Sequence, residues 1–268
     1  MKNSTNVLSE LIKCLGLKAI QEHFQSLAEE AERDGMSYVD YLKQLLQLEF
    51  ERRHQARIER LRKQAKIPRN KLLREFEIAR VEGLSHSMLN ALAEGEFIDR
   101  CENVLIFGEP GAGKTHIAIA LAREWCLHGR KVLYTTTAAL VQELMVAKKA
   151  LALNALIKKL DRYEVLVIDD ISYVPYDREE ADVLFVLLSD RYEQRSIVIT
   201  SNLAFSKWDK VFKDEMTTAA AIDRLVHHAT ILELKVVESY RAAQAKARQA
   251  LARAQKTELL KEVTKDKI

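Results

Sequence analysis

Apolar residues recur every three or four positions along the N-terminal part of the chain, which is the period of an amphipathic helix. One apolar stripe runs from Leu8 to Leu27, and a second runs from Val39 to Leu61. The other faces of the second stripe carry a run of basic residues that includes Arg52 and Arg53. The pattern therefore predicts that this part of the chain consists of helices only.

The borders of these helices are marked by residues that interrupt or cap them. Asp34 and Gly35 break the first stripe, and the Ser37 hydroxyl can cap a second helix with Asp40 three residues later. Pro68 ends the second stripe, because proline lacks the N–H group that a continuing helix needs.

From residue 101 the pattern changes to short β-rich runs that alternate with segments of helix length. Such alternation predicts βαβ crossovers and therefore a parallel sheet with flanking helices. Three of the runs contain the letters VLIF, VLVI and IVIT, which are continuously apolar or β-branched, as in strands buried on both faces. The five predicted strands lie at residues 103–107, 131–135, 164–168, 196–200 and 230–234.

Together these patterns predict an α/β fold with a five-stranded parallel sheet, preceded by a small all-helical domain. The scarcity of glycine and proline, 8 and 3 residues, also fits a helix-rich chain. The expected parts are a helical N-terminal domain (1–68), a connector with a short helix near 87–94 (69–100), an α/β core (101–238) and a basic C-terminal helix or tail (239–268).

The net charge of the chain is only +3, but its basic residues are clustered. Residues 43–74 hold eleven Lys and Arg against three acids, and residues 241–268 hold eight against three. Such blocks suit a polyanionic partner, although solvated helix faces explain them equally well. No apolar run is long enough to cross a bilayer, and the start of the chain shows no secretory signal. Cys14, Cys101 and Cys126 lack zinc spacing, so we expect free thiols in a reducing cytoplasm.

The strongest chemical signal is the octapeptide GEPGAGKT, which matches GxxxxGK[ST] between a predicted strand and a predicted helix. Its glycines let successive backbone N–H groups point into one concavity, where a phosphate fits. In such a loop we expect Lys114 to place a cation on the β- and γ-phosphates of ATP, and the Thr115 hydroxyl to ligate Mg²⁺. We expect the nucleotide to contact Gly108, Glu109, Pro110, Gly111, Ala112, Gly113, Lys114, Thr115 and His116.

Two carboxylates follow the predicted strand VLVI, at the edge of the sheet where a phosphate crevice forms. We expect Asp169 to hold Mg²⁺ together with Thr115, and Asp170 to orient or deprotonate the attacking water. Asn202 ends the next strand, where its amide can donate to the γ-phosphate or to that water. Each signal also has an ordinary explanation, because a strand can run into an acidic turn and asparagine commonly forms turns.

The order of P-loop, acidic strand end and strand-terminal asparagine resembles that of an AAA+ ATPase. The strings GKTHIAIAL, VIDDISYVPYDREEADVLFVLLSDRYEQRS and ITSNLAFSKW resemble the IstB-type ATPases that assist insertion-sequence transposases. They are also similar to those of the DnaC-type helicase loaders. The resemblance covers roughly residues 7–242 and implies a P-loop AAA+ fold with ATP and Mg²⁺ as its ligands.

By this resemblance, Arg224 falls where the family carries its arginine finger, although an ordinary surface arginine is the alternative. A finger reaches the γ-phosphate of a neighbouring subunit, so it implies a homo-oligomer with ATP-bridged interfaces. AAA+ proteins usually carry Glu as the second acid, whereas this chain has Asp170, as the IstB-like pattern does. Because Asp is one methylene shorter than Glu, we expect that the attacking water sits closer to Asp170 or that turnover is slow. Only 34 residues follow the last predicted strand, so we expect the lid to be reduced or absent, and Arg241 falls where a second sensor would.

Initiator-type AAA+ proteins carry an extra helical insertion between their second and third strands that contacts DNA. Lysines in this region would contact phosphates rather than bases. The basic N-terminal helix is a second candidate, for docking DNA or a transposase, and solvated charge is the alternative for both. The DNA-binding candidates are Lys148, Lys149, Lys158 and Lys159 in the insertion, and Arg52 and Arg53 in the N-terminal helix.

The resemblance implies an ATP-dependent helper of DNA transposition that assembles on double-stranded DNA, recruits or stimulates a transposase, and is reset by hydrolysis. A replicative helicase loader would share the same ATPase core, and a nucleotide-gated DNA-binding scaffold with negligible turnover would share the nucleotide site. A small-molecule kinase is disfavoured because no acceptor-site signature is present. His116, His227 and His228 lack metal spacing, and we interpret them as local packing residues.

Overall fold

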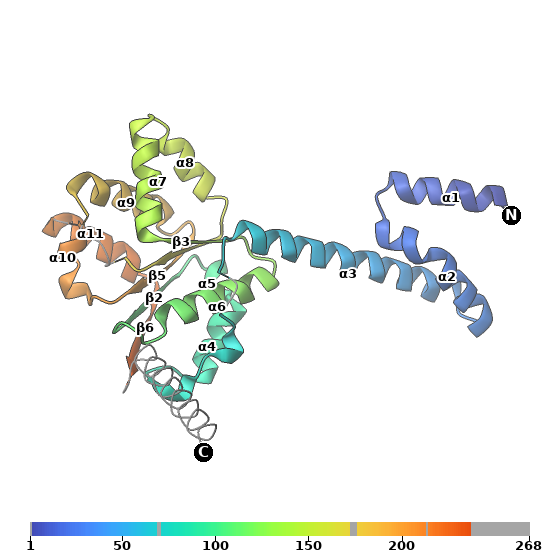
Figure 1. The fold of residues 1–268 in the computed structure, drawn as a ribbon, viewed down its shortest axis with the longest axis horizontal. Helices are drawn as coiled ribbons and strands as arrows, with labels where there is room; N and C mark the ends of the chain where they lie inside the picture. The colour runs from blue at the N-terminus through green and yellow to red at the C-terminus, as the bar shows by residue number, and fades with distance from the viewer. Residues whose placement is uncertain (1, 69–70, 172–175, 213, 237–268) are drawn as a thin grey trace, which may run out of the picture. The chain divides into compact units, whose positions relative to one another are not determined.

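The computed structural model describes residues 2–68, 71–171, 176–212 and 214–236 (Figure 1). The chain divides into two compact units, Met1–Leu61 and Arg62–Ile268. Within the described ranges, no helix is both long and apolar enough to cross a membrane. The expected basic tail over 239–268, which includes Arg241 and would contain any reduced lid, lies outside the described residues.

The first unit is helical, as the apolar period predicts. Its small core consists of Ile12, Ile20, Phe24 and Leu45, with Leu17, Leu27 and Tyr41 packed against it. Its elements are α1 (Lys2–Cys14), α2 (Lys18–Asp34) and the greater part of α3 (Tyr38–Gln64).

The turn between α2 and α3 forms as its sequence predicts. Gly35 ends α2 with φ +64°, a left-handed conformation that glycine adopts without steric cost. The Asp40 backbone N–H donates to Ser37 Oγ at 3.1 Å, and the Ser37 hydroxyl donates to Asp40 Oδ2 at 2.6 Å. The predicted cap at the start of α3 is therefore confirmed.

The last two members of the predicted stripe, Ile58 and Leu61, are buried as expected, but over the first half of α3 the buried face differs from the stripe. Val39, Leu42, Leu46 and Phe50 are all more than half exposed, whereas Leu45 and Glu49 are buried. Glu49 is stabilised there because its carboxylate accepts hydrogen bonds from Arg52 Nη2 (2.7 Å), Arg53 Nε (2.7 Å) and the Ala19 backbone N–H (2.8 Å). The bond from Arg52, with those from Arg53 and Ala19, lowers the pKa of Glu49 to about 2 against the opposing effect of burial.

The second unit contains a six-stranded sheet in the order β1-β6-β2-β5-β4-β3. All five predicted strands are present and mutually parallel. The sixth, β1, pairs antiparallel with β6 at the sheet edge, and its two residues are too few to give a periodic signal. The strands are β1 (Val81–Glu82), β2 (Asn103–Gly108), β3 (Val132–Thr136), β4 (Val165–Asp169), β5 (Ser196–Ser201) and β6 (Ala229–Val236).

Helices cover both faces of this sheet and connect its parallel strands (Figure 1). The short helix expected near 87–94 is α4 (His86–Glu94), which the Ser85 hydroxyl caps by accepting from the Met88 N–H. The other helices are α5 (Glu96–Asp99), α6 (Lys114–Leu127), α7 (Thr137–Lys149), α8 (Leu153–Leu160), α9 (Arg178–Arg191), α10 (Asp209–Phe212) and α11 (Glu215–Val226), with 3-10 turns η1 (Leu73–Glu75), η2 (Ile78–Arg80) and η3 (Phe205–Lys207).

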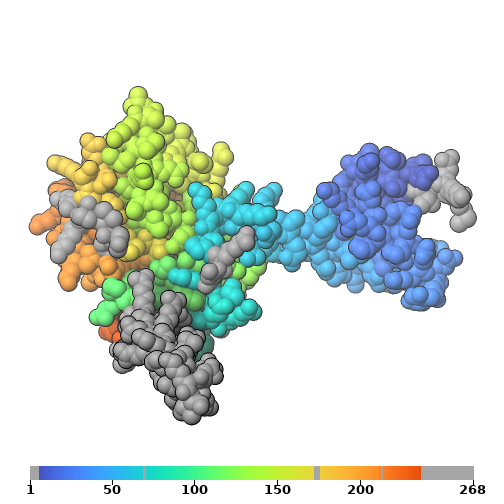
Figure 2. Space-filling view, in the orientation of Figure 1, coloured from blue at the N-terminus to red at the C-terminus, as the bar shows by residue number. Residues whose placement is uncertain are grey.

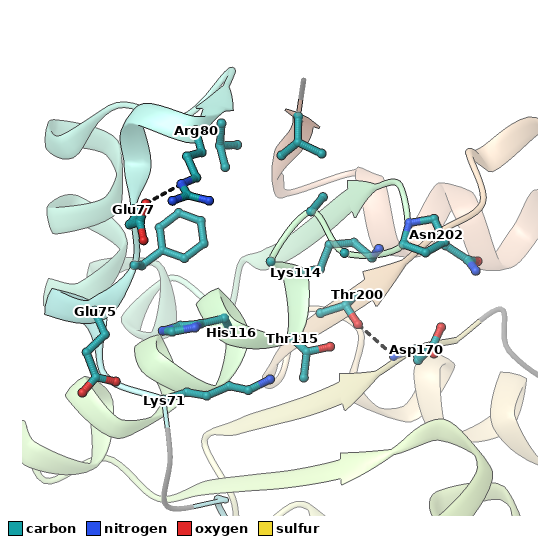
Figure 3. Close-up of a pocket in the computed structure, with 17 residues that line it drawn as sticks. Lys71, Glu75, Glu77, Arg80, Lys114, Thr115, His116, Asp170, Thr200 and Asn202 are labelled. Carbon is teal, nitrogen blue, oxygen red and sulfur yellow. Dashed lines mark hydrogen bonds and ion pairs between the residues drawn. The ribbon is translucent and has the colours of Figure 1, made fainter. Parts of the chain in front are cut away.

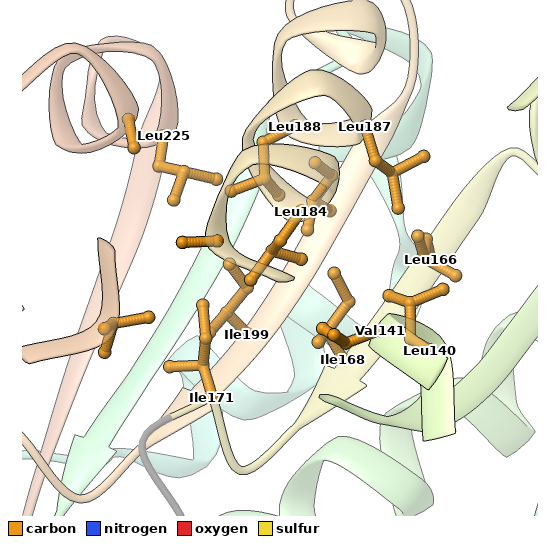
Figure 4. Packing of buried hydrophobic residues seen from close by; sticks show 14 of the residues in the cluster. Leu140, Val141, Leu166, Ile168, Ile171, Leu184, Leu187, Leu188, Ile199 and Leu225 are labelled. Atoms are coloured by element: carbon orange, nitrogen blue, oxygen red, sulfur yellow. The ribbon is translucent and has the colours of Figure 1, made fainter. Parts of the chain in front are cut away.

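The two faces of the sheet contribute to two separate apolar cores. Alternate residues of β4 point to opposite faces, so Leu166 and Ile168 belong to one core while Val165 and Val167 belong to the other. Figure 4 shows the first core, in which leucines of α9 and α7 pack over Leu166, Ile168 and Ile199. This burial on both sides explains the unbroken apolar runs of the sequence, and it fixes the strand ends at which the polar residues lie.

Candidate nucleotide-binding site

The loop between β2 and α6 folds around the side chain of Lys114. The Lys114 ammonium group donates to the carbonyl oxygens of Gly108 at 2.7 Å and of Glu109 at 3.0 Å. Lys114 is also the first residue of α6, and the positive end of the helix dipole faces the same loop. A phosphate group that enters this loop would therefore meet a fixed cation and several backbone donors.

Two glycines of the loop have no room for a side chain. A Cβ atom on Gly113 would lie 2.7 Å from Cε2 of Phe76, and its φ of +92° is left-handed. A Cβ atom on Gly108 would lie 2.6 Å from the backbone oxygen of Leu234. These glycines therefore allow β6 and the connector to approach the loop closely.

The Asp169 carboxylate at the end of β4 is buried and is held by three hydroxyl groups. Its Oδ1 accepts hydrogen bonds from Thr115 Oγ1 at 3.0 Å and from Thr200 Oγ1 at 2.6 Å. Its Oδ2 accepts a hydrogen bond from the Tyr134 hydroxyl at 2.8 Å. Burial, together with the charge of Asp169, raises the pKa of Tyr134, so this phenol remains a donor.

The Thr115 and Asp169 oxygens fit the ligand preference of Mg²⁺. Magnesium takes oxygen ligands at about 2.0–2.1 Å in an octahedron, which places neighbouring ligands about 2.9 Å apart. The 3.0 Å separation of Thr115 Oγ1 and Asp169 Oδ1 agrees with that spacing. These two residues are therefore suited to hold one ion beside the phosphate-binding loop.

Asp170 and Asn202 line the same cavity as the phosphate-binding loop (Figure 3). The Asp170 backbone is left-handed, with φ +63°, and its N–H donates to Thr200 Oγ1 at 2.8 Å. The Thr200 hydroxyl thus accepts a hydrogen bond from the Asp170 backbone and donates one to the Asp169 carboxylate. Of the loop residues predicted to contact nucleotide, those that line this cavity are Pro110, Gly111, Ala112, Gly113, Lys114, Thr115 and His116.

The connector forms a wall of the cavity that the sequence did not reveal. The Phe76 ring lies edge-on to the His116 ring, with 5.5 Å between centroids, and His116 Nε2 lies 2.9 Å from the Leu72 carbonyl oxygen. Glu77 forms an ion pair with Arg80 on the same wall (Figure 3). Aromatic and apolar groups next to a phosphate-binding loop suit a planar base. The connector residues that line the cavity are Lys71, Glu75, Phe76, Glu77, Arg80 and Val81. No sequence motif marks them, because the connector sequence is charged and irregular.

Arg224 lies in the last turn of α11 and is not among the residues that line the described cavity. Its Nη1 donates to the Ala220 carbonyl oxygen at 3.1 Å, and its guanidinium carbon lies 5.1 Å from the centroid of the Phe185 ring. The aromatic ring and the carbonyl thus hold the guanidinium group at the partly exposed surface between α9 and α11.

The four lysines of the predicted DNA-contacting insertion lie on α7 and α8. These two helices belong to the yellow-green part of the surface in Figure 2. Lys149, Lys158 and Lys159 are exposed, whereas Lys148 is partly buried and lies 3.6 Å from Glu179. On α8, Ile157 and Leu160 face the core, which leaves Lys158 and Lys159 to face solvent.

Arg52 and Arg53, the candidates in the first unit, each donate a 2.7 Å hydrogen bond to Glu49. Part of their donor capacity is therefore used to hold that buried carboxylate. The Arg53 side chain is still 55% exposed, compared with 35% for Arg52.

Comparison with known proteins places this chain in a family. The model of the IstB-like ATP binding protein family matches residues 10–249. The chain is 41% identical over 247 residues to a putative insertion sequence ATP-binding protein of Sinorhizobium fredii, covering 90% of this chain and 83% of that protein. It is 39% identical over 234 residues to the IS21 putative ATP-binding protein of Pseudomonas aeruginosa, covering 87% and 88%. AMPPCP-bound DnaA from Aquifex aeolicus shares the AAA+ fold, with a TM-score of 0.53 and 19% identity over 63% of this chain and 51% of the DnaA chain.

Proposed function

Because the chain belongs to the IstB-like ATP-binding proteins of insertion sequences, we propose that it hydrolyses ATP to control a transposition complex on DNA. The observation that carries this proposal is that Lys114 and Thr115 line one cavity and that the Thr115 hydroxyl bonds to the Asp169 carboxylate at 3.0 Å. A cation, a hydroxyl group and a carboxylate at the end of a parallel sheet are the parts that a Mg²⁺–triphosphate requires.

Binding begins with the phosphates in the loop before α6. The Lys114 ammonium group, now bonded to two carbonyl oxygens, would exchange them for β- and γ-phosphate oxygens. Thr115 and Asp169 would hold Mg²⁺, which neutralises charge on the phosphate oxygens. Phe76 would contact the base from the connector wall.

Hydrolysis then requires a water molecule placed in line with the γ-phosphate. Asp170 and Asn202 both line the cavity and supply an acceptor and an amide for that water. The hydrogen bond from the Asp170 backbone to Thr200 holds this acid in its left-handed conformation. Because Asp170 is one methylene shorter than Glu, we expect slow turnover.

Arg224 would complete the site of a neighbouring subunit. Its position at a surface between α9 and α11, away from the cavity of its own chain, supports a role in trans. ATP would then bridge two subunits of a homo-oligomer, and hydrolysis would loosen the contact.

The assembled subunits would bind double-stranded DNA through Lys149, Lys158 and Lys159, whose exposed ammonium groups suit phosphates rather than bases. Such binding carries little sequence preference and is strongly dependent on salt. The helical first unit, with Arg52 and Arg53, is the proposed docking surface for a transposase or for DNA.

Phosphate release from mixed oligomers tests this function. We expect Lys114→Ala and Arg224→Ala to be inactive alone, and a mixture of the two to regain activity. Recovery follows because a Lys114→Ala subunit still offers Arg224 to its neighbour's intact cavity. The control is a mixture of Arg224→Ala with the double variant, which offers no finger and should stay inactive. If no mixing ratio restores activity, the shared interface is contradicted.

Two further outcomes would redirect the proposal. ATP-dependent DNA binding without phosphate release, unchanged in Asp170→Ala, would indicate a scaffold with negligible turnover. Capture of a replicative helicase but not of a transposase in a pull-down would indicate a helicase loader.

A further inference from the structure

We propose that Glu193, His227 and His228 form a binding site for a divalent transition-metal ion. The His227 Nδ1 and His228 Nε2 atoms lie 3.6 Å and 3.8 Å from Glu193 Oε1. The three ligand atoms all lie within 4.8 Å of one another. In a tetrahedral zinc site with bonds of about 2.0–2.1 Å, neighbouring ligand atoms are about 3.4 Å apart. Small rotations of exposed side chains would bring the three to that spacing.

This site lies at the end of the sheet opposite the nucleotide cavity. Glu193 precedes the start of β5 and His228 precedes the start of β6, whereas the residues of the nucleotide site follow strand ends. The proposal therefore does not depend on ATP binding or hydrolysis.

The ligand set selects the class of ion. Two imidazoles and one carboxylate suit zinc, cobalt, nickel or copper, whereas magnesium and calcium prefer oxygen ligands only. The side chains of Glu193, His227 and His228 are 55%, 51% and 54% exposed, so water molecules can complete the coordination shell. The two histidines are thus surface residues whose rings contact each other, with 4.1 Å between ring centroids.

The turn that carries Glu193 is fixed from inside the protein. Arg191 is fully buried, and its guanidinium group donates to the carbonyl oxygens of Leu160 at 3.1 Å, Tyr163 at 3.0 Å and Ser196 at 3.1 Å. The bond to Ser196 joins the two ends of the turn from α9 to β5, and the other two tie this turn to the end of α8 and to the segment between α8 and β4. Glu193 itself has a left-handed backbone, with φ +58°, within this anchored turn.

The turn that carries the two histidines is tied to the first by Asn103. The Asn103 side chain donates to the Leu225 carbonyl oxygen at 3.1 Å and accepts from the Ile197 N–H at 2.9 Å. Its backbone N–H also donates to the His228 carbonyl oxygen at 2.7 Å. One buried residue therefore fixes the end of α11 relative to the start of β5, which preorganises the ligand backbones.

Neighbouring groups complete the surroundings of the site. The Tyr192 hydroxyl lies 2.7 Å from His227 Nδ1, so it holds the ring in the absence of metal and can bond a metal-bound water in its presence. Because His227 follows Arg224 by three residues, a bound ion would also restrain the helix end that carries this arginine.

Metal titration of the full chain without an affinity tag or nucleotide tests the site. Calorimetry with Zn²⁺ should show one equivalent that the His227→Ala/His228→Ala double variant binds at least about tenfold more weakly. The matched control is His128→Ala, because His128 is also exposed and lies at a helix end. Its affinity should equal that of the wild type, whereas Glu193→Gln should lie between the two.

The absorption spectrum of bound Co²⁺ identifies the ligands. We expect nitrogen and oxygen ligation, without the thiolate charge-transfer band that binding at Cys14 or Cys101 would give. Equal zinc affinity in the double variant and the wild type would overturn the proposal, as would a thiolate band or the absence of stoichiometric binding. A circular dichroism spectrum like that of the wild type would show that the double variant is folded.

Discussion

The Tyr134 hydroxyl, on β3, donates a 2.8 Å hydrogen bond to Oδ2 of Asp169, on the neighbouring strand β4. This bond leaves Oδ1 of the same carboxylate to Thr115 and Thr200. A carboxylate held at both oxygens cannot rotate freely, so its Oδ1 keeps one orientation toward the Thr115 hydroxyl. Tyr134 is therefore part of what positions the proposed magnesium ligand.

Replacing this phenol tests that positioning. In Tyr134→Phe the ring remains but Oδ2 loses a donor to a charged group, which is worth about 1.5–3 kcal/mol. We expect the Mg²⁺ concentration for half-maximal phosphate release to rise roughly tenfold. ATP binding measured without Mg²⁺ should be unchanged. Tyr38→Phe is the control, because Tyr38 is 94% exposed. An unaltered Mg²⁺ dependence in Tyr134→Phe would show that the bond does not position Asp169.

Gly113 tests the closeness of the connector to the phosphate-binding loop. In Gly113→Ala the new Cβ would lie 2.7 Å from Phe76, and φ is +92°. We expect ATP affinity, measured by fluorescence titration, to fall by about tenfold or more because the loop or the Phe76 ring must shift. Gly16→Ala is the control: its φ is also positive, but nothing lies within 4 Å of the new Cβ. Normal affinity in Gly113→Ala would contradict the described wall.

Glu49 makes the stability of the chain depend on pH. Its folded-state pKa is about 2, below the usual 4.5, because Arg52, Arg53 and Ala19 donate to the carboxylate. The ionised form therefore stabilises the fold above about pH 4.5, and this contribution is lost as pH falls toward 2.

Urea unfolding of Glu49→Gln measures this contribution. At pH 7 the free energy of unfolding should fall by about 1–3 kcal/mol, and the difference from wild type should shrink between pH 4.5 and 2. Glu51→Gln, at an exposed position on the same helix, should have little effect. A difference that stays constant over this pH range would indicate that the charge of Glu49 is not its cause.

Lys158 and Lys159 test the DNA-contacting surface. The slope of log affinity against log salt should become smaller by about 0.9 for each phosphate that a variant no longer neutralises. We expect Lys158→Ala/Lys159→Ala to bind double-stranded DNA more weakly in the presence of ATP, with a slope smaller by about 2. Lys13→Ala/Lys131→Ala removes the same charge from other exposed positions. Equal slopes in the two double variants would place the DNA elsewhere.

The sheet was predictable because burial on both faces leaves an uninterrupted apolar run in each inner strand. The P-loop was predictable because its chemistry needs particular residues at fixed spacing. The exposure of the apolar residues in the first half of α3 was not predictable, because the sequence does not show which side of a long helix packs against other helices. Glu49 occupies a buried position that only its three donors explain.

Contacts between distant segments were the other part that the sequence concealed. Tyr134 reads as an ordinary strand residue, and its role depends on the register between β3 and β4. Phe76 reads as part of an irregular connector, yet its ring packs against Gly113 and His116. Likewise, the closeness of Glu193 to His227 and His228 cannot be read from the sequence, because Glu193 lies in another turn.

Calorimetric titration with Mg-ATP tests the central claim, that the nucleotide binds between the Lys114 loop and Asp169. The account predicts one ATP bound per chain in the wild type. It predicts no measurable heat in Lys114→Ala, and in Asp169→Asn binding that no longer responds to added Mg²⁺. Unchanged Mg-ATP affinity in Lys114→Ala would contradict it.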